Sequence, residues 1–173
     1  PVCKGIPPGD LFANDVNKIA AWLADRKVET MIWGDFLLDR DYWSKLGVDA
    51  VNSGNPFFGG HKVHLGLEKI RKDVIITDWH YNSEKVYLTF KHFADSGFRV
   101  IGCPWLGDVN NYYSTRNIAD QRQMGVLVTD WGFLSTRSPS ANSVLGALVA
   151  WNTNTPEPGK LGWIPQAVWS SSI

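Results

Sequence analysis

The sequence has 173 residues, enough for one domain with a hydrophobic core, and its hydrophobic (44%) and charged (20%) fractions are ordinary for a globular protein. The 17 basic residues balance the 17 acidic ones, and no apolar run approaches the roughly 18 residues that cross a bilayer, so we expect neither nucleic acid nor a membrane as a partner. Two cysteines are too few for a disulfide scaffold, and no Cys/His spacing is typical of a zinc site, so we expect no metal and no other cofactor.

The N-terminal third is predicted to contain a helix, a strand and a long loop. From Asp10 to Lys27, apolar residues recur at helical spacing, namely Leu11, Val16, Ile19, Ala20, Trp22 and Leu23. A strand centred on Thr30 to Trp33 follows. Residues 39–60 are rich in Asp, Asn, Gly and aromatic residues, which predicts a loop, and a short helix is expected over residues 62–69.

The middle of the chain is predicted to be strand, helix, strand. DVIITDW, residues 73–79, is a continuous apolar run ending in polar residues, as in a strand buried on both faces. Ser83 is the expected N-cap of a helix that stops at Gly97. FRVIGCPW, residues 98–105, is the next expected strand.

The C-terminal part repeats this order. We expect a helix over about residues 111–124, a strand over residues 126–131, and a helix over residues 138–151 with proline in its first turn. We assign residues 1–151 to one domain of strand–helix units and residues 152–173 to a C-terminal tail.

Alternating strands and helices predict a parallel sheet covered by helices. A tryptophan stands at the C-terminal end of each expected strand, at Trp33, Trp79, Trp105 and Trp131, and the last three are 26 residues apart. Ligands of parallel α/β folds bind at these strand ends, so the four tryptophans predict an aromatic-walled pocket. The alternative is that they are core residues that fill this end of the sheet.

An aromatic wall of this kind suits a carbohydrate. The C–H faces of sugar rings pack on indole rings, while their hydroxyl groups bind carboxylates and amides. Asp35 shares a face with Trp33 by strand alternation and is the best candidate to touch a ligand, and Asn111 is close to a strand end. No glycine-rich phosphate loop follows any expected strand, which argues against a nucleotide.

The carboxylates do not form an obvious catalytic pair. Glycoside hydrolysis normally needs a general acid and a second stabilising group. Asp78 and Asp130 are expected to point away from the adjacent tryptophans, towards helices or neighbouring turns, where they would cap helices or bind loop amides. Asp39 and Asp41 are interpreted as solvated loop residues.

Four segments together resemble a known family. MIWGDFLL, DVIITDWHY, GFRVIGCPW and GVLVTDWG are similar in order and spacing to the last four strands of glycoside hydrolase family 20, the β-N-acetylhexosaminidases. The resemblance covers about residues 1–151 and implies the C-terminal half of a (β/α)8 TIM-type barrel. The family's catalytic Asp–Glu pair, which acts with the substrate's own N-acetyl group in retaining hydrolysis, would precede Pro1. This chain alone would then be inactive.

The resemblance also implies which residues bind substrate. The expected set is Trp33, Asp35, Trp79, Tyr81, Trp105, Asn111, Tyr112 and Trp131. The tryptophans would wall the acetamido group and the sugar ring, and Asp35 and Tyr81 would be polar contacts. Asn111, with Tyr112 or Tyr113, would correspond to the tyrosine contact of the family's seventh strand. Phe133 departs from the family, which often has a glutamate there to hold sugar hydroxyl groups.

A half-barrel has two open edge strands with unpaired backbone groups. Besides an N-acetylhexosamine-containing glycan, the expected partners are therefore the missing N-terminal half-barrel or a second copy of the chain. Two other interpretations remain open: a carbohydrate-binding module without catalysis, and a flavodoxin-like or half-barrel unit with a structural or interaction role.

Overall fold

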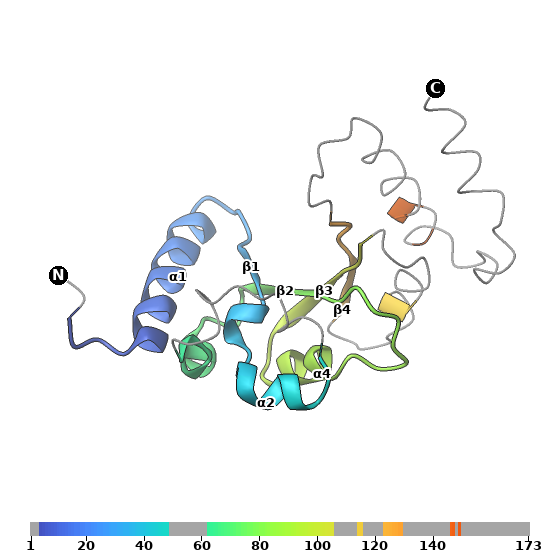
Figure 1. The fold of residues 1–173 in the computed structure, drawn as a ribbon. Coiled ribbons are helices and arrows are strands. Elements are labelled where there is room, and N and C mark those ends of the chain that lie inside the picture. The colour runs from blue at the N-terminus through green and yellow to red at the C-terminus, as the bar shows by residue number, and fades with distance from the viewer. Residues whose placement is uncertain are drawn as a thin grey trace, which may run out of the picture.

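The computed structural model describes residues 4–48, 62–105, 114–115, 123–129, 146–147 and 149 (Figure 1). Its centre is an all-parallel sheet of four strands in the order β1-β2-β3-β4. The strands are β1 (Met31–Trp33), β2 (Ile75–Trp79), β3 (Arg99–Cys103) and β4 (Gln123–Val126). Each strand lies beside the one before it in the chain, so the predicted parallel α/β architecture is confirmed.

The register of the sheet decides which side chains share a face. Trp33 pairs with Thr77, and Trp79 pairs with Cys103. Paired residues of neighbouring strands project to the same side, and so do residues two apart on one strand. Trp33, Thr77 and Trp79 therefore occupy one face of the sheet. Ile76 and Asp78 occupy the other.

Helix α4 (Leu88–Asp95) covers the face that carries Ile76. Two glycines allow this close packing. A Cβ atom on Gly34 would lie 2.8 Å from both Phe93 Cε2 and Ile76 Cγ2, and one on Gly102 would lie 2.8 Å from Phe90 Cζ. The phenylalanine rings of α4 thus fill the space that side chains at these glycines would need, and Phe93 is fully buried.

Helix α1 (Pro8–Ala24) confirms the first predicted helix and packs against the 3₁₀ helix η3 (Val63–Lys69) (Figure 1). A Cβ atom on Gly9 would lie 2.6 Å from the backbone nitrogen of Gly66, so the two backbones touch directly. Ile19 and Trp22, expected on the buried face, are instead 56% and 57% exposed. The buried residues of α1 are instead the small ones, Gly9, Ala13 and Ala20, because only small side chains allow so close a contact. The Arg26 guanidinium covers the exposed Trp22 ring at 3.8 Å from its centroid.

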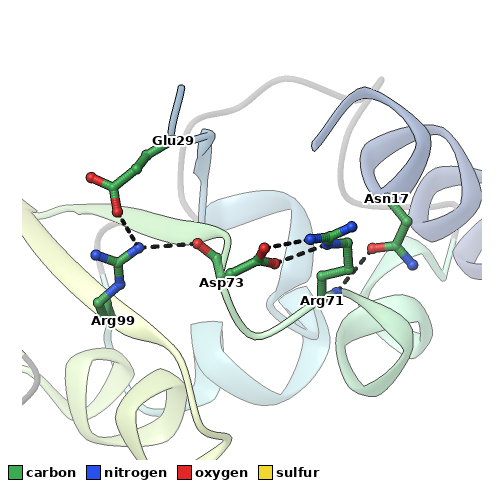
Figure 2. A network of polar contacts seen from close by, with 5 residues as sticks. All are labelled: Asn17, Glu29, Arg71, Asp73 and Arg99. Carbon is green, nitrogen blue, oxygen red and sulfur yellow. Dashed lines mark hydrogen bonds and ion pairs between the residues drawn. The ribbon is translucent and has the colours of Figure 1, made fainter. Parts of the chain in front are cut away.

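A chain of polar contacts ties α1 to the N-terminal ends of β2 and β3 (Figure 2). The Arg99 guanidinium donates to the Glu29 carboxylate at 2.6 Å and to the Asp73 carbonyl at 3.1 Å. Arg71 binds both oxygens of the Asp73 carboxylate, at 2.9 and 2.5 Å. The backbone N–H of Arg71 donates to Asn17 Oδ1 at 2.9 Å, which completes the link to α1.

The prediction of a loop from residue 39 was wrong over its first residues. The Asp39 carboxylate accepts hydrogen bonds from the backbone N–H groups of Asp41 (3.0 Å) and Tyr42 (3.4 Å), and so caps the short helix α2 (Arg40–Lys45). Trp43 anchors this helix in the core at 7% exposure. Asp41 is exposed, as expected, but lies in the helix. Residues 49–60 lie outside the described part of the chain.

Two other boundaries also differ from prediction. Ser83 is not an N-cap, because α4 begins at Leu88, after a segment held in place by the buried Tyr87, whose hydroxyl donates to the Asn82 carbonyl at 2.8 Å. Strand β4 begins at Gln123, three residues before the predicted start, because this residue pairs with Val100 in β3. It ends at Val126, so it overlaps the strand predicted over residues 126–131 at one residue. The predicted helix over residues 111–124 is thus too long at its C-terminal end.

The remaining predicted elements are seen only in part. Residues 114–115, and residues 146, 147 and 149, are helical, as the predictions for 111–124 and 138–151 require. The tail from residue 152 lies outside the described residues. Within the described ranges no helix is both long and apolar enough to cross a membrane.

Candidate functional site

Three aromatic side chains form a continuous surface at the C-terminal ends of β2 and β3. Trp79 is the last residue of β2, Tyr81 follows two residues later, and Trp105 lies two residues beyond β3. The Trp79 and Tyr81 rings stack with centroids 4.9 Å apart, and the Tyr81 and Trp105 rings are 5.5 Å apart. All three are half-buried. We call Trp79, Tyr81 and Trp105 the aromatic cluster.

Asp35 joins this cluster from the neighbouring strand. It follows β1 and begins the 3₁₀ helix η1 (Asp35–Leu37). The Trp79 side chain, through its indole N–H, donates a hydrogen bond to the Asp35 carboxylate. Asp35 Oδ1 is buried and receives no hydrogen bond from the described residues. The carboxylate therefore has one oxygen engaged by the cluster and one with unused acceptor capacity.

Burial gives this carboxyl group an unusual protonation equilibrium. Desolvation raises the pKa of Asp35 from 3.8 to about 6, and the negative charge of Asp78 adds a smaller increase. The hydrogen bond from Trp79 and nearby backbone N–H groups oppose the rise. A carboxyl group in this range exchanges its proton near neutral pH, which suits either acid–base chemistry or a pH-dependent contact with a ligand.

Trp33 occupies the same face of the sheet, one strand away from Trp79. It ends β1, pairs with Thr77 and is half-buried. The structure thus places Trp33, Asp35, Trp79, Tyr81 and Trp105 at the C-terminal ends of three adjacent strands. The other expected site residues, namely Asn111, Tyr112 and Trp131, lie outside the described residues, as do Asp130, Tyr113 and Phe133.

A buried polar network lies on the opposite face, behind the aromatic cluster. Asp78 points away from Trp79, as alternation predicts, and accepts a hydrogen bond from the Thr89 hydroxyl of α4 at 2.6 Å. His80 Nε2 lies 2.6 Å from Thr89 Oγ1 and 3.2 Å from Asp78 Oδ2. The expectation that Asp78 would cap a helix or bind loop amides was wrong, because its described partners are these two side chains.

This network holds the segment that carries Tyr81. The His80 ring stacks on Tyr87 with centroids 4.4 Å apart, and Tyr87 in turn binds the Asn82 carbonyl. Sequence reasoning missed His80 and Thr89. Alternation could have placed His80 on the side of Asp78, but Thr89 comes from the next helix, and no sequence periodicity links it to β2.

The opposite end of the sheet has a cavity of different chemical character. A cavity of about 260 Å³ lies between the C-terminal end of α1 and the strand starts, and Lys27, Glu29, Asp73 and Arg99 contribute to its lining. Glu29 and Arg99 form an ion pair there, and Asp73 binds Arg71. Because its acidic groups are already paired, this cavity is a weaker candidate than the aromatic cluster.

The donor set does not indicate a metal centre. Among the described residues, no three His, Cys, Asp or Glu side chains are grouped as metal ligands would be. Cys103 is buried, and burial strongly raises the pKa of its thiol, which disfavours the thiolate needed for nucleophilic attack or metal binding.

Comparisons with known proteins add no assignment. Neither a scan against protein-family models nor a search of curated proteins finds a match for this chain. The site geometry and the sequence motifs are therefore the grounds for a functional conclusion.

Proposed function

We propose that this chain is the substrate-binding part of a glycoside hydrolase that acts on N-acetyl-β-hexosaminides. The observation that carries the proposal is the aromatic cluster with the Asp35 carboxylate attached to it, at the C-terminal ends of parallel strands. The four segments that resemble glycoside hydrolase family 20 include β1, β2, β3 and part of β4.

The topology supports a half-barrel as the frame. In a (β/α)8 barrel the parallel strands follow one another in chain order, helices cover the outer face, and ligands bind at the C-terminal strand ends. The described sheet has this strand order, with α4 on one face and the aromatic cluster at the C-terminal ends. The face with Trp33 and Thr77 would then line the barrel interior.

The chemistry of the site fits a sugar. The half-buried Trp79 and Trp105 rings offer apolar faces for the C–H groups of a pyranose, and the Asp35 carboxyl group beside Trp79 adds a polar group at the same strand ends. In the proposed enzyme, the Asp–Glu pair that protonates the leaving group and orients the acetamido group comes from outside this chain. The residues of this chain enclose and orient the sugar.

One observation favours a second candidate, a carbohydrate-binding module without catalysis. Retaining and inverting glycosidases normally place two carboxyl groups around the scissile bond. Among the described residues, Asp35 contacts the aromatic cluster, while Asp78 lies on the helix-covered face. A single carboxyl group binds a sugar but does not supply both an acid and a second stabilising group.

Open apolar surface supports a protein partner beside the sugar. Within the described residues β1 pairs only with β2, and Met31 on this strand is 52% exposed. The proposed cover for this edge is the complementary half-barrel or a second copy of the chain. Sedimentation across a range of protein concentrations tests the second case, since self-association shifts the mean mass upward.

A binding titration tests the proposal. Adding N-acetylglucosamine or its β-linked dimer should shift the indole N–H resonances of Trp79 and Trp105 in NMR spectra, and glucose should bind more weakly. Trp105→Ala should weaken binding about tenfold, as expected for loss of a stacking contact of ~1.4 kcal/mol. Trp22→Phe, on the exposed face of α1, is the matched control and should leave affinity unchanged.

Two results would contradict the proposal. If no resonance shifts at roughly 50 mM sugar, any dissociation constant is higher than a useful binding site would have, and the carbohydrate assignment is wrong. Turnover of an aryl N-acetyl-β-glucosaminide by this chain alone, lost in Asp35→Asn, would show that the chain itself carries the catalytic group. Our proposal expects binding without turnover.

A further inference from the structure

We propose that His80 and Tyr87 are positioning residues for Tyr81, so that contacts on the helix-covered face set the affinity of the aromatic cluster for its ligand. His80 precedes Tyr81 in the chain, and Tyr87 binds the residue that follows it, Asn82. The placement of the Tyr81 ring concerns the protein alone, whereas the effect on affinity rests on the proposed sugar-binding function.

Tyr81 provides the middle ring of the aromatic cluster. Its ring centroid lies 4.9 Å from that of Trp79, with an interplanar angle of 29°, and 5.5 Å from that of Trp105, with an angle of 54°. Trp79 ends β2 and Trp105 lies beyond β3, so the Tyr81 ring spans two neighbouring strand ends. Displacement of this ring would divide the aromatic surface into two separate tryptophans.

The backbone at Tyr81 lies beyond the paired part of the sheet. The last paired residues of β2 and β3 are Trp79 and Cys103, and residues 80–82 belong to neither a strand nor a helix. A segment without strand pairing keeps one conformation only when other contacts outweigh its conformational entropy. Two anchors, one on each side of Tyr81, connect this segment to the start of α4.

The first anchor is the His80 ring, which is 3% exposed. Its Nε2 atom lies 2.6 Å from Thr89 Oγ1 and 3.2 Å from Asp78 Oδ2. Thr89 donates its only hydroxyl proton to Asp78, so the Thr89 oxygen accepts from His80, and Nε2 carries the proton. The His80 ring also stacks on Tyr87, with centroids 4.4 Å apart and planes 11° apart. Its orientation is therefore fixed both by a hydrogen bond and by a stack.

The second anchor is the Tyr87 hydroxyl group, which donates to the Asn82 carbonyl at 2.8 Å. Tyr87 is 2% exposed and directly precedes the first residue of α4. Because Tyr87 also stacks on His80, the residues on both sides of Tyr81 are held by one buried group. A segment ordered in this way raises affinity, because the ligand does not have to order it on binding.

The first experiment measures the placement of the Tyr81 ring without a sugar. Tyr87→Phe removes the hydroxyl group that binds Asn82 but keeps the ring that stacks on His80. Nuclear Overhauser cross-peaks between the Tyr81 ring protons and those of Trp79 and Trp105 should lose intensity in this variant. Unchanged cross-peaks in Tyr87→Phe would contradict its positioning role.

Two substitutions of His80 test the other anchor in the same spectra. His80→Phe keeps an aromatic ring against Tyr87 but removes the donor to Thr89, whereas His80→Gln restores an N–H donor of similar reach. The Tyr81 cross-peaks should lose intensity in His80→Phe and be partly restored in His80→Gln. Cross-peaks that are as strong in His80→Phe as in the wild-type chain would show that the hydrogen bond does not position Tyr81.

A matched control separates positioning from a general loss of stability. Val74 is 1% exposed and lies just before β2, at the other end of that strand from Tyr81. Val74→Ala should lower the free energy of unfolding by leaving a small cavity, yet leave the Tyr81 cross-peaks unchanged. An equal loss of cross-peak intensity in Val74→Ala would reduce the role of His80 and Tyr87 to ordinary structural support.

The second experiment titrates the same variants with N-acetylglucosamine. Tyr87→Phe should weaken binding about threefold to fivefold, as expected when loss of one neutral hydrogen bond lowers the population of the binding-competent segment. Val74→Ala should bind like the wild-type chain. Displaced Tyr81 with unchanged affinity overturns the ligand half of the inference. Absence of sugar binding in the wild-type chain, with the cross-peak changes present, overturns that half through the proposed function instead.

Discussion

Charged groups have opposite surroundings at the two ends of the sheet. At the N-terminal end, Arg71 and Arg99 engage Asp73 and Glu29 in a connected set of contacts that reaches α1 (Figure 2). At the C-terminal end, the Asp35 carboxyl group lies beside aromatic rings, and its Oδ1 is buried without a hydrogen bond from the described residues. Paired charges of the first kind tie elements together, whereas a desolvated and incompletely bonded carboxylate lowers stability when it is ionised.

The pKa values of the two acidic residues show this difference. The Arg71 guanidinium lowers the pKa of Asp73, which is exposed, while burial raises the pKa of Asp35. Folding therefore favours the ionised form of Asp73 and the protonated form of Asp35. In parallel α/β folds, stability resides mainly at the N-terminal strand ends and ligand chemistry at the C-terminal ends. The contrast between Asp73 and Asp35 follows that division.

The largest expected effect is on the pH dependence of stability at Asp35. Its folded-state pKa of about 6 lies above the ordinary 3.8, so the folded chain holds the proton more tightly. Stability from this group is complete below pH 3.8 and falls as the pH rises to about 6, by about 2–3 kcal/mol. Urea unfolding of the wild-type chain and Asp35→Asn at several pH values should show this fall in the difference between them. A constant difference would place Asp35 in an ordinary solvated setting.

A second prediction concerns the buried polar network of Asp78, His80 and Thr89 behind the aromatic cluster, which we expect to contribute to stability. Thr89→Val keeps the side-chain shape but removes the hydroxyl that donates to the buried Asp78 carboxylate. The loss should lower the free energy of unfolding by about 2 kcal/mol, because a buried acceptor loses a donor. Thr89→Ser, which keeps the hydroxyl, is the control and should cost less. If Thr89→Val unfolds like the wild-type chain in urea, the network is not structural.

The smallest effect on stability is expected at the N-terminal end of the sheet, where the charged groups are paired. Arg71→Ala removes an exposed ion pair with Asp73, so the loss of stability should be small, and it should be smaller still in high salt because exposed charges are screened. Sugar affinity should be unaffected, because the pair lies at the other end of the strands. Thermal unfolding at low and high salt measures this loss of stability. Lys91→Ala, which removes the exposed ion pair between Lys91 and Asp95, serves for comparison. A large loss of sugar binding in Arg71→Ala would show that the two ends are not independent.

Sequence patterns located β1, β2, β3 and the first helix well, because long apolar runs have few alternatives to burial. They failed at shorter elements. The helix α2 depends on an Asp39 cap and one buried ring, Trp43, and this signal is weak within a glycine-rich stretch. The late start of α4 depends on Tyr87 packing against His80, a contact that no periodicity encodes.

The same limit applies to the candidate site. Alternation and strand ends were enough to place Trp33, Asp35, Trp79 and Tyr81 near one rim, because parallel strands bring equivalent positions together. The contact between the Asp35 carboxylate and the Trp79 indole was not predictable, since it requires the register of β1 against β2 and the turn at Gly34. Nor could the sequence show that the carboxylate would be desolvated.

The sequence alone thus determined a parallel sheet, with Trp33, Trp79 and Trp105 at or just beyond the C-terminal ends of its first three strands, because hydrophobic burial and side-chain alternation follow from local order. Tertiary structure decided which polar groups are paired. Arg71 meets Asp73 in water, and Asp35 meets Trp79 in a buried setting, because packing fixes the surroundings of each charge, and those surroundings set its energy.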